Sequence, residues 1–249
     1  MNTRKIGLAA LLGLMSVLAF TAPAIAGPCD SGTLIDWDAD AFAYETNYAF
    51  LTSNPGSQLT MVGVINLFCA PLNVFNPADP TKEYTFFFNG LVSQGTSIIP
   101  VGTVTVYDTN YDQGNFFIVE GSPRNAPLAT TPMPSNPPNA TVPLNFVDGT
   151  VILSGDLNNF NTVVSIGGTG GPSGNFRGDY RFTGGTHFGL VAGQTDGLFT
   201  GLWCAPVIAD GSVCDVQPGY SAHPDGKFDQ SEATPAASST WGAIKAMYR

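Results

Sequence analysis

Apolar and polar residues alternate at a period of two along much of this chain, which is typical of β-strands with one buried face. Segment 174–183 is the clearest example, because Phe176, Tyr180 and Phe182 share one face and polar residues share the other. Segment 41–51 repeats the pattern, with aromatic residues on one face and Ala, Glu and Asn on the other. After residue 26, only the C-terminal end shows any helical periodicity. The pattern therefore predicts an all-β protein.

The remaining apolar segments are short and are separated by Gly, Pro, Asn and Asp, which mark turns. We predict further strands at 58–68, 83–92, 102–107, 115–120, 142–146, 150–154, 160–166, 187–191 and 198–203. Asp148-Gly149 is typical of a tight hairpin turn between two of these strands, and 225–229 is predicted to be a turn as well. Many short strands separated in this way predict an antiparallel β-sandwich or jelly-roll-like domain.

The first residues have the pattern of an export signal. Two cations, Arg4 and Lys5, precede the apolar stretch 6–20, which leads to the small-x-small motif at 24–26 that signal peptidase cleaves. We therefore expect residues 1–26 to be a cleaved signal peptide and the mature protein to be secreted, extracellular or at the cell surface. After this segment no apolar run reaches the roughly 18 to 20 residues that a membrane-spanning helix needs, so no transmembrane span is predicted.

The composition of the mature chain changes in two places. Segment 123–143 is rich in proline and is predicted to be a long exposed loop. The composition changes again after residue 230, where Ser, Ala and Thr dominate. We predict one β-sandwich domain at 27–230, followed by a flexible spacer and C-terminal tail at 231–249.

The tail ends in aromatic, aliphatic and basic residues, namely Trp241, Ile244, Lys245, Tyr248 and Arg249. A flexible spacer before such an end resembles the short C-terminal tails of exported bacterial proteins that secretion or surface-anchoring systems recognise. The resemblance implies that these five residues form a docking peptide. The alternative is a terminal segment that packs Trp241 and Ile244 on the domain, since chain ends are ordered only where they are tied down.

Charged residues are scarce and mostly acidic, with 9 Lys and Arg against 19 Asp and Glu and a net charge of −10. Nucleic acid and anionic membranes are excluded as expected partners, because both bind basic surfaces. Few lysines also leave sheet edges without the positive charge that commonly prevents strand addition. Self-association is therefore among the expected interactions.

Four cysteines remain after the predicted cleavage site, and an even number in an exported chain favours disulfides. We predict the pairs Cys204–Cys214, which closes a short loop, and Cys29–Cys69, which ties the mature N-terminus to an early strand. A zinc site is the alternative. It lacks support because no C-x-x-C motif occurs and both histidines lie away from any cysteine pair at ligand spacing.

Oxygen-bearing residues recur at alternate positions in segment 108–114, which is predicted to be a hairpin loop. Asp108, Asn110 and Asp112 have the spacing of a short calcium loop, although the Gly and Glu of an EF-hand are missing. The alternative is a plain solvated turn. Calcium is the only cofactor that this spacing suggests, and otherwise none is expected.

The polar face of segment 174–183 is the best candidate binding surface. Its members are Asn175, Arg177, Asp179 and Arg181. Two guanidinium groups that flank a carboxylate can bind a sugar acid or another polar ligand through bidentate hydrogen bonds. The alternative is the solvated side of a half-buried antiparallel strand, which has the same alternation.

Residues for catalysis are few. The chain has no H-E-x-x-H and no G-x-S-x-G motif, and its only histidines are His187 and His223. Glu120 shares a predicted strand face with Phe116 and Ile118, where burial would raise its pKa toward that of a general acid, but no second carboxylate is identified. The alternative is a strand-end carboxylate in solvent.

These patterns favour an exported, non-catalytic protein with a structural or adhesive role at or outside the cell surface. Its expected partners are cell-surface or extracellular proteins or glycans. The alternative is a carbohydrate-binding module or a glycan-active enzyme on a β-sandwich.

Overall fold

The computed structural model describes residues 29, 32–37, 41–49, 51–126, 144–167, 173–205, 216 and 219–230. Strands account for nearly all of its regular structure. They are β1 Thr33–Trp37, β2 Ala41–Glu45, β3 Gln58–Val64, β4 Leu67–Phe68, β5 Glu83–Val101, β6 Val104–Tyr111, β7 Gly114–Gly121, β8 Thr150–Gly167, β9 Ser173–Gly184, β10 Asp196–Cys204 and β11 His223–Gln230. Two short helices, α2 Leu144–Val147 and the 3-10 helix η1 Phe188–Leu190, complete the described elements. The all-β prediction is confirmed.

All eleven strands belong to one antiparallel sheet, with the order β2-β3-β5-β6-β8-β9-β10-β11-β1-β4 and with β7 between β5 and β8. The sandwich or jelly-roll arrangement is therefore not confirmed. Two long strands explain the single sheet, since β5 has 19 residues and β8 has 18. Each pairs with β7 over one half and with β6 over the other. A strand shared in this way joins what would otherwise be two separate sheets.

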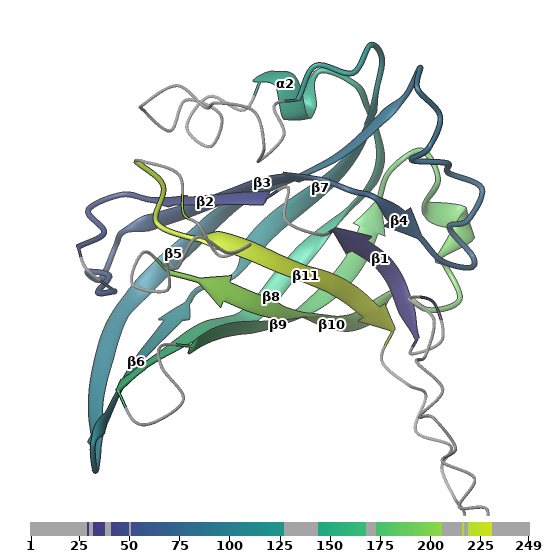
Figure 1. Ribbon diagram of the computed structural model, residues 1–249. Helices are drawn as coiled ribbons and strands as arrows, with labels where there is room; N and C mark the ends of the chain where they lie inside the picture. Colours follow the sequence, from purple (N-terminus) through teal and green to yellow (C-terminus); the bar gives the residue numbers. More distant parts are fainter. Residues whose placement is uncertain are drawn as a thin grey trace, which may run out of the picture.

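The sheet closes on itself, because β2, at one end of the strand order, meets the segment just before β11, near the other end. β1 pairs with both β11 and β4, while β2 pairs with β3. Ala43 of β2 also bridges to Ala222, just before β11, and its N–H donates to the Ala222 carbonyl at 2.9 Å. Figure 1 shows β11, β1 and β2 crossing in front of β5, β7 and β8, which form the opposite wall.

Aromatic side chains fill the interior of the closed sheet. Ring centroids lie 4.7 Å apart for Trp37–Phe86, 4.7 Å for Phe88–Phe199 and 4.8 Å for Phe176–Phe199. These residues come from β1, β5, β9 and β10 and are all buried. Burying such large apolar rings is the main stabilising contribution expected for this fold.

A second, smaller core lies on the outer face of β2, β3 and β5. Phe42 and Val62 pack there with Phe146 of α2. The Thr85 hydroxyl donates to the Phe146 carbonyl at 2.8 Å and holds α2 against β5. The alternation in segment 41–51 predicts one buried face, but β2 is covered on both faces because this second core lies over it.

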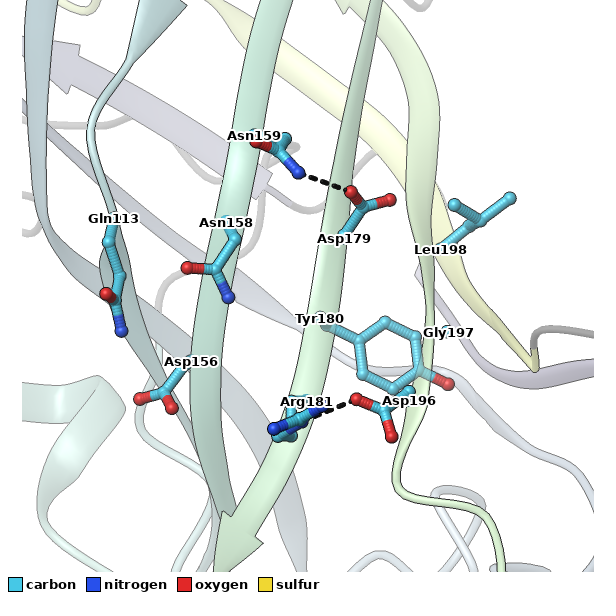
Figure 2. Close-up of a pocket in the computed structure, with 10 residues that line it drawn as sticks. All are labelled: Gln113, Asp156, Asn158, Asn159, Asp179, Tyr180, Arg181, Asp196, Gly197 and Leu198. Atoms are coloured by element: carbon cyan, nitrogen blue, oxygen red, sulfur yellow. Dashed lines mark hydrogen bonds and ion pairs between the residues drawn. The ribbon is translucent and has the colours of Figure 1, made fainter.

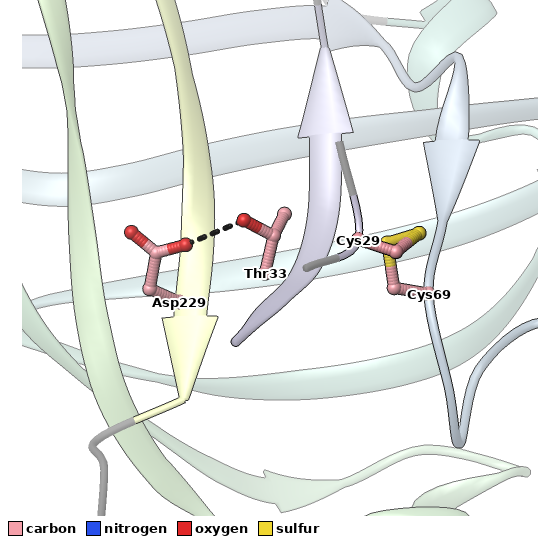
Figure 3. Close-up of a disulfide and its surroundings, with 4 residues drawn as sticks. All are labelled: Cys29, Thr33, Cys69 and Asp229. Atoms are coloured by element: carbon pink, nitrogen blue, oxygen red, sulfur yellow. Dashed lines mark hydrogen bonds between the residues drawn. A yellow bond between two sulfur atoms is a disulfide. The ribbon is translucent and has the colours of Figure 1, made fainter. Parts of the chain in front are cut away.

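The predicted disulfide Cys29–Cys69 is confirmed and links residues 40 positions apart. Figure 3 shows that it joins the N-terminal end of β1 to the chain that follows β4. On the other side of β1, the Thr33 hydroxyl donates to the Asp229 carboxylate at 2.8 Å. Cys204 is disulfide-bonded as well. Its predicted partner, Cys214, lies outside the described residues.

Three local predictions are wrong. Segment 187–191 is predicted as a strand but contains the helix η1. Segment 142–146 is also predicted as a strand, but 144–147 forms α2, so Asp148-Gly149 connects a helix to β8 and is not the turn of a hairpin. Segment 225–229 is predicted as a turn but lies in β11. Its signal is weak because Gly226 occupies an inward position, where a Cβ atom would approach the Phe176 ring to 2.5 Å. The ring fills the space that an apolar side chain normally fills.

The predicted signal peptide at 1–26 and the tail at 231–249 lie outside the described residues, as does most of the proline-rich segment 123–143. Within the part of the chain that the structure describes, no helix is both long and apolar enough to cross a membrane.

Candidate binding surface

The alternation predicted for β9 is confirmed. Phe176, Tyr180 and Phe182 point into the interior, whereas the polar residues lie on the outer face of the sheet. Of the four polar residues, Asp179 and Arg181 line a hollow on this outer face. Asn175 and Arg177 lie farther along β9 and do not line it. That any of the four binds a ligand stays a prediction.

This outer hollow has a volume of about 550 Å³ and lies over β8, β9 and β10, next to the turn between β6 and β7. Figure 2 shows its polar side chains in neighbouring rows across the three strands. The residues that carry its chemistry are Gln113, Asp156, Asn158, Asp179, Arg181 and Asp196. Strand register explains the rows, because Arg181 is paired with both Asp156 and Asp196, and Asp179 is paired with Asn158.

Arg181 lies between two carboxylates in the first row. Its Nε atom contacts an Asp196 carboxylate oxygen at 2.6 Å, with both side chains more than half exposed. This hydrogen bond lowers the pKa of Asp196 and raises that of Arg181. Asp156 also interacts electrostatically with Arg181. Because solvent screens such exposed charges, the row contributes little to folding stability and its groups remain accessible.

A bulge brings an additional amide to the second row. The β8–β9 register shifts between Asn158 and Asn161, and Asn159 has a positive φ of 50°. Asn adopts this left-handed conformation more readily than most residues. Both Asn158 and Asn159 consequently line the outer hollow, and the Asn159 amide donates to Asp179 at 2.7 Å.

Tyr180 lines the outer hollow from the core side of the sheet. Its hydroxyl is buried and has no hydrogen-bond partner within the described chain, and burial raises its pKa. Figure 2 shows the ring lying across toward Gly197 on β10. A Cβ atom at Gly197 would stand 2.4 Å from the tyrosine oxygen, so glycine is needed there for this packing.

The chemistry of the outer hollow suits a ligand with many hydroxyl groups. Each amide of Gln113, Asn158 and Asn159 offers donors and an acceptor, and each carboxylate accepts several hydrogen bonds. Sequence reasoning identified Asp179 and Arg181 but missed the residues of β8 and β10. The one local signal was the pair of asparagines at 158 and 159.

The residues of the predicted calcium loop lie in a different setting from the one expected. Asp108 and Asn110 belong to strand β6, and the Asn161 amide donates to them at 2.5 and 3.2 Å. Asp112 follows β6 and accepts from Gln94 at 2.6 Å. No group of three or more His, Cys, Asp or Glu with metal-binding geometry occurs among the described residues. Calcium binding here stays a prediction.

The residues with catalytic potential lie away from the outer hollow. Glu120 is partly exposed and forms an ion pair with Lys82 at 2.8 Å. His187 is exposed beside Thr186, whereas His223 is buried at the start of β11 and stacks on Phe42.

Sequence reasoning also missed a buried polar cluster around Glu45. The Glu45 side chain accepts hydrogen bonds from Ser53 and, at 3.0 Å, from the Tyr111 hydroxyl. Burial raises the pKa of Glu45 despite these bonds. Burial and the nearby Glu45 charge together raise the pKa values of Tyr48 and Tyr111. The alternation pattern did not predict that Glu45 is buried, because Glu45 shares its strand face with small alanines.

Comparisons of this chain with protein-family models, with curated proteins and with solved structures find no match. Its function is therefore inferred from the side chains of the outer hollow and from the packing that presents them.

Proposed function

We propose that this chain is an exported protein with a non-catalytic, structural or adhesive role at or outside the cell surface. The outer hollow carries the proposal, because it presents polar groups to solvent on a rigid sheet. The Cys29–Cys69 disulfide supports an oxidising destination, and the signal-like pattern of residues 1–26 supports export. The interior is filled by aromatic rings, so ligands would meet the protein at its surface.

A specific observation favours glycan binding as the adhesive activity. The amides of Gln113 and Asn158 line the outer hollow and have no protein partner within the described chain. Sugar hydroxyls can both donate to and accept from such groups. A bound saccharide would thus satisfy donors and acceptors that the fold leaves available.

The charge of the outer hollow narrows the class of glycan. Among the described residues that line it, Asp156, Asp179 and Asp196 face a single cation, Arg181, and the whole chain carries −10. Like charges across an interface disfavour binding. A neutral or amino-substituted saccharide therefore fits better than the sugar acid suggested by the two arginines of β9.

A glycan array with matched variants tests this proposal. Asn158→Ala removes an amide inside the outer hollow, whereas Asn175→Ala removes one from the same sheet face outside it. We expect Asn158→Ala to weaken retention by about 3- to 10-fold, as loss of one or two hydrogen bonds predicts. Asn175→Ala should bind like the unmodified protein.

The result can contradict each part of the proposal. Equal losses in the two variants would place binding elsewhere, and retention of no glycan would remove the glycan-binding activity. Release of reducing sugar from a retained glycan would show an enzyme instead of an adhesive protein.

Export and surface location need a separate measurement, since folding does not report them. Intact mass in fractions of the producing cells should find a chain that begins at Gly27 in the envelope or the medium. A cytoplasmic chain that retains residues 1–26 would contradict the proposed location. In the calcium alternative, a chelator should lower the melting temperature, and an unchanged temperature would remove calcium from the proposal.

A further inference from the structure

The distal half of β5 has an edge without a neighbouring strand. β3 pairs with β5 only as far as Gln58↔Val92, and the described chain offers no strand beside the segment 97–101 except β6. Figure 1 shows this β5–β6 hairpin reaching beyond the rest of the sheet at the lower left. A free strand edge is a template for pairing with another chain.

Exposed apolar side chains accompany this edge. Ile98 is 55% exposed, Ile99 43% and Val101 58%. Ile99 pairs with Val106 on β6, so the apolar surface continues across both strands. From Gly95 to Tyr107 the chain has no charged residue, and the hairpin thus lacks the lysines that usually protect an edge.

Backbone geometry identifies the atoms that face outward. The Thr96 N–H donates to the Ser53 carbonyl at 3.1 Å on the side away from β6. Backbone groups alternate direction along an antiparallel strand, so those of Ile98 point to the same side. Pro100 shares that direction but has no N–H, which shortens the ladder that a partner could form.

We propose that the edge at 97–101 pairs with the same edge of a second copy of this chain, in an antiparallel and weak dimer. An antiparallel pair of identical edges has two-fold symmetry, so each Ile98 N–H meets a carbonyl of the other copy. Two copies with a charge of −10 each repel elsewhere, and this uncharged segment is where they can approach. Pro100 limits the pairing to a short ladder.

Sedimentation of the full mature chain tests the proposal. Between about 5 and 500 µM, the range in which small interfaces associate, we expect a monomer–dimer equilibrium. Ile98→Pro removes the outward N–H without removing a bond to β6, and Ile99→Lys adds charge at the edge. Each should raise the dissociation constant at least about tenfold.

Val74→Lys is the matched control, because Val74 is 65% exposed away from the hairpin. It should leave the dissociation constant within about twofold, as expected for a charge outside an interface. A wild-type chain that stays monomeric throughout would overturn the proposal. Dimers that survive both edge variants, or that Val74→Lys weakens equally, would overturn it as well. Glycan retention is measured independently, so failure of the dimer leaves the proposed adhesive function standing.

Discussion

The two halves of β5 are built from similar residues but lie in different surroundings. Over 85–89 the strand is paired on both sides, with β3 and with β7, and Phe86 and Phe88 are fully buried. Over 97–101 it is bonded to β6 alone and its isoleucines are exposed. The β-propensity of the residues thus favours a strand over the whole of β5. Neighbouring strands on both edges and packed side chains on both faces determine which half stabilises the fold.

The largest effect is expected in the enclosed half. Phe88 lies 4.7 Å from Phe199, 5.6 Å from Phe116 and 5.9 Å from Phe228 between ring centroids. Phe88→Ala should lower the free energy of unfolding by about 3–5 kcal/mol, because it leaves a cavity that the surrounding rings cannot fill. Urea unfolding followed by tryptophan fluorescence measures this loss.

Phe87→Ala is the matched control on the opposite face of the same strand. Phe87 is only partly buried and stacks on Phe117 at 6.1 Å. It should cost roughly half as much or less, since less apolar area is removed from contact. Equal losses at the two positions would mean that the interior is not the main source of stability.

An intermediate effect is expected where the two halves meet. Ser53 accepts from and donates to Thr96 at the point where β5 leaves the enclosed body, and Ser53 also donates to buried Glu45. Burial raises the folded-state pKa of Glu45 above its reference of 4.5. As the pH rises above 4.5, the unfolded chain releases this proton first, so the free energy of unfolding falls until the raised folded-state pKa is passed.

Glu45→Gln should remove this part of the pH dependence. Gln carries no charge at any pH, and its amide can hydrogen-bond with Ser53 and Tyr111. We expect the free energy of unfolding of the variant to fall less than that of the unmodified protein across that window, measured by urea unfolding at several pH values. Glu83, whose pKa burial also raises, is present in both proteins and cancels in the difference. Parallel pH profiles would contradict the assignment.

These regions also show what residue patterns can predict. Alternation predicted β9 well because its outer residues are polar and its inner residues aromatic. It failed for β11, where Gly226 faces the Phe176 ring. Alternation could not predict that the sheet closes on itself, because the bridge between Ala43 and Ala222 joins distant positions that carry no distinctive side chain.

The same distinction applies to the candidate binding surface. Asp179 and Arg181 could be identified because they lie two residues apart on one strand. Asp156 and Asp196 become their neighbours only through the register of β8, β9 and β10. Strand register depends on the packed faces and turns of the whole sheet, so it cannot be predicted from the sequence of one segment alone.

The smallest effect is expected in the exposed half of β5. Ile99→Ala should change the free energy of unfolding by less than about 0.5 kcal/mol when measured at concentrations where the chain is monomeric, because solvent already contacts the side chain. Hydrogen exchange should agree, with amides of 97–101 exchanging faster than those of 84–92, since local opening of the hairpin breaks few contacts. Raising the protein concentration should then slow exchange at Ile98, whose N–H faces the open edge, more than at Phe88. Exchange as slow at Ile98 as at Phe88 in the monomer would show that other parts of the chain cover this edge, and the contrast between the two halves would be lost.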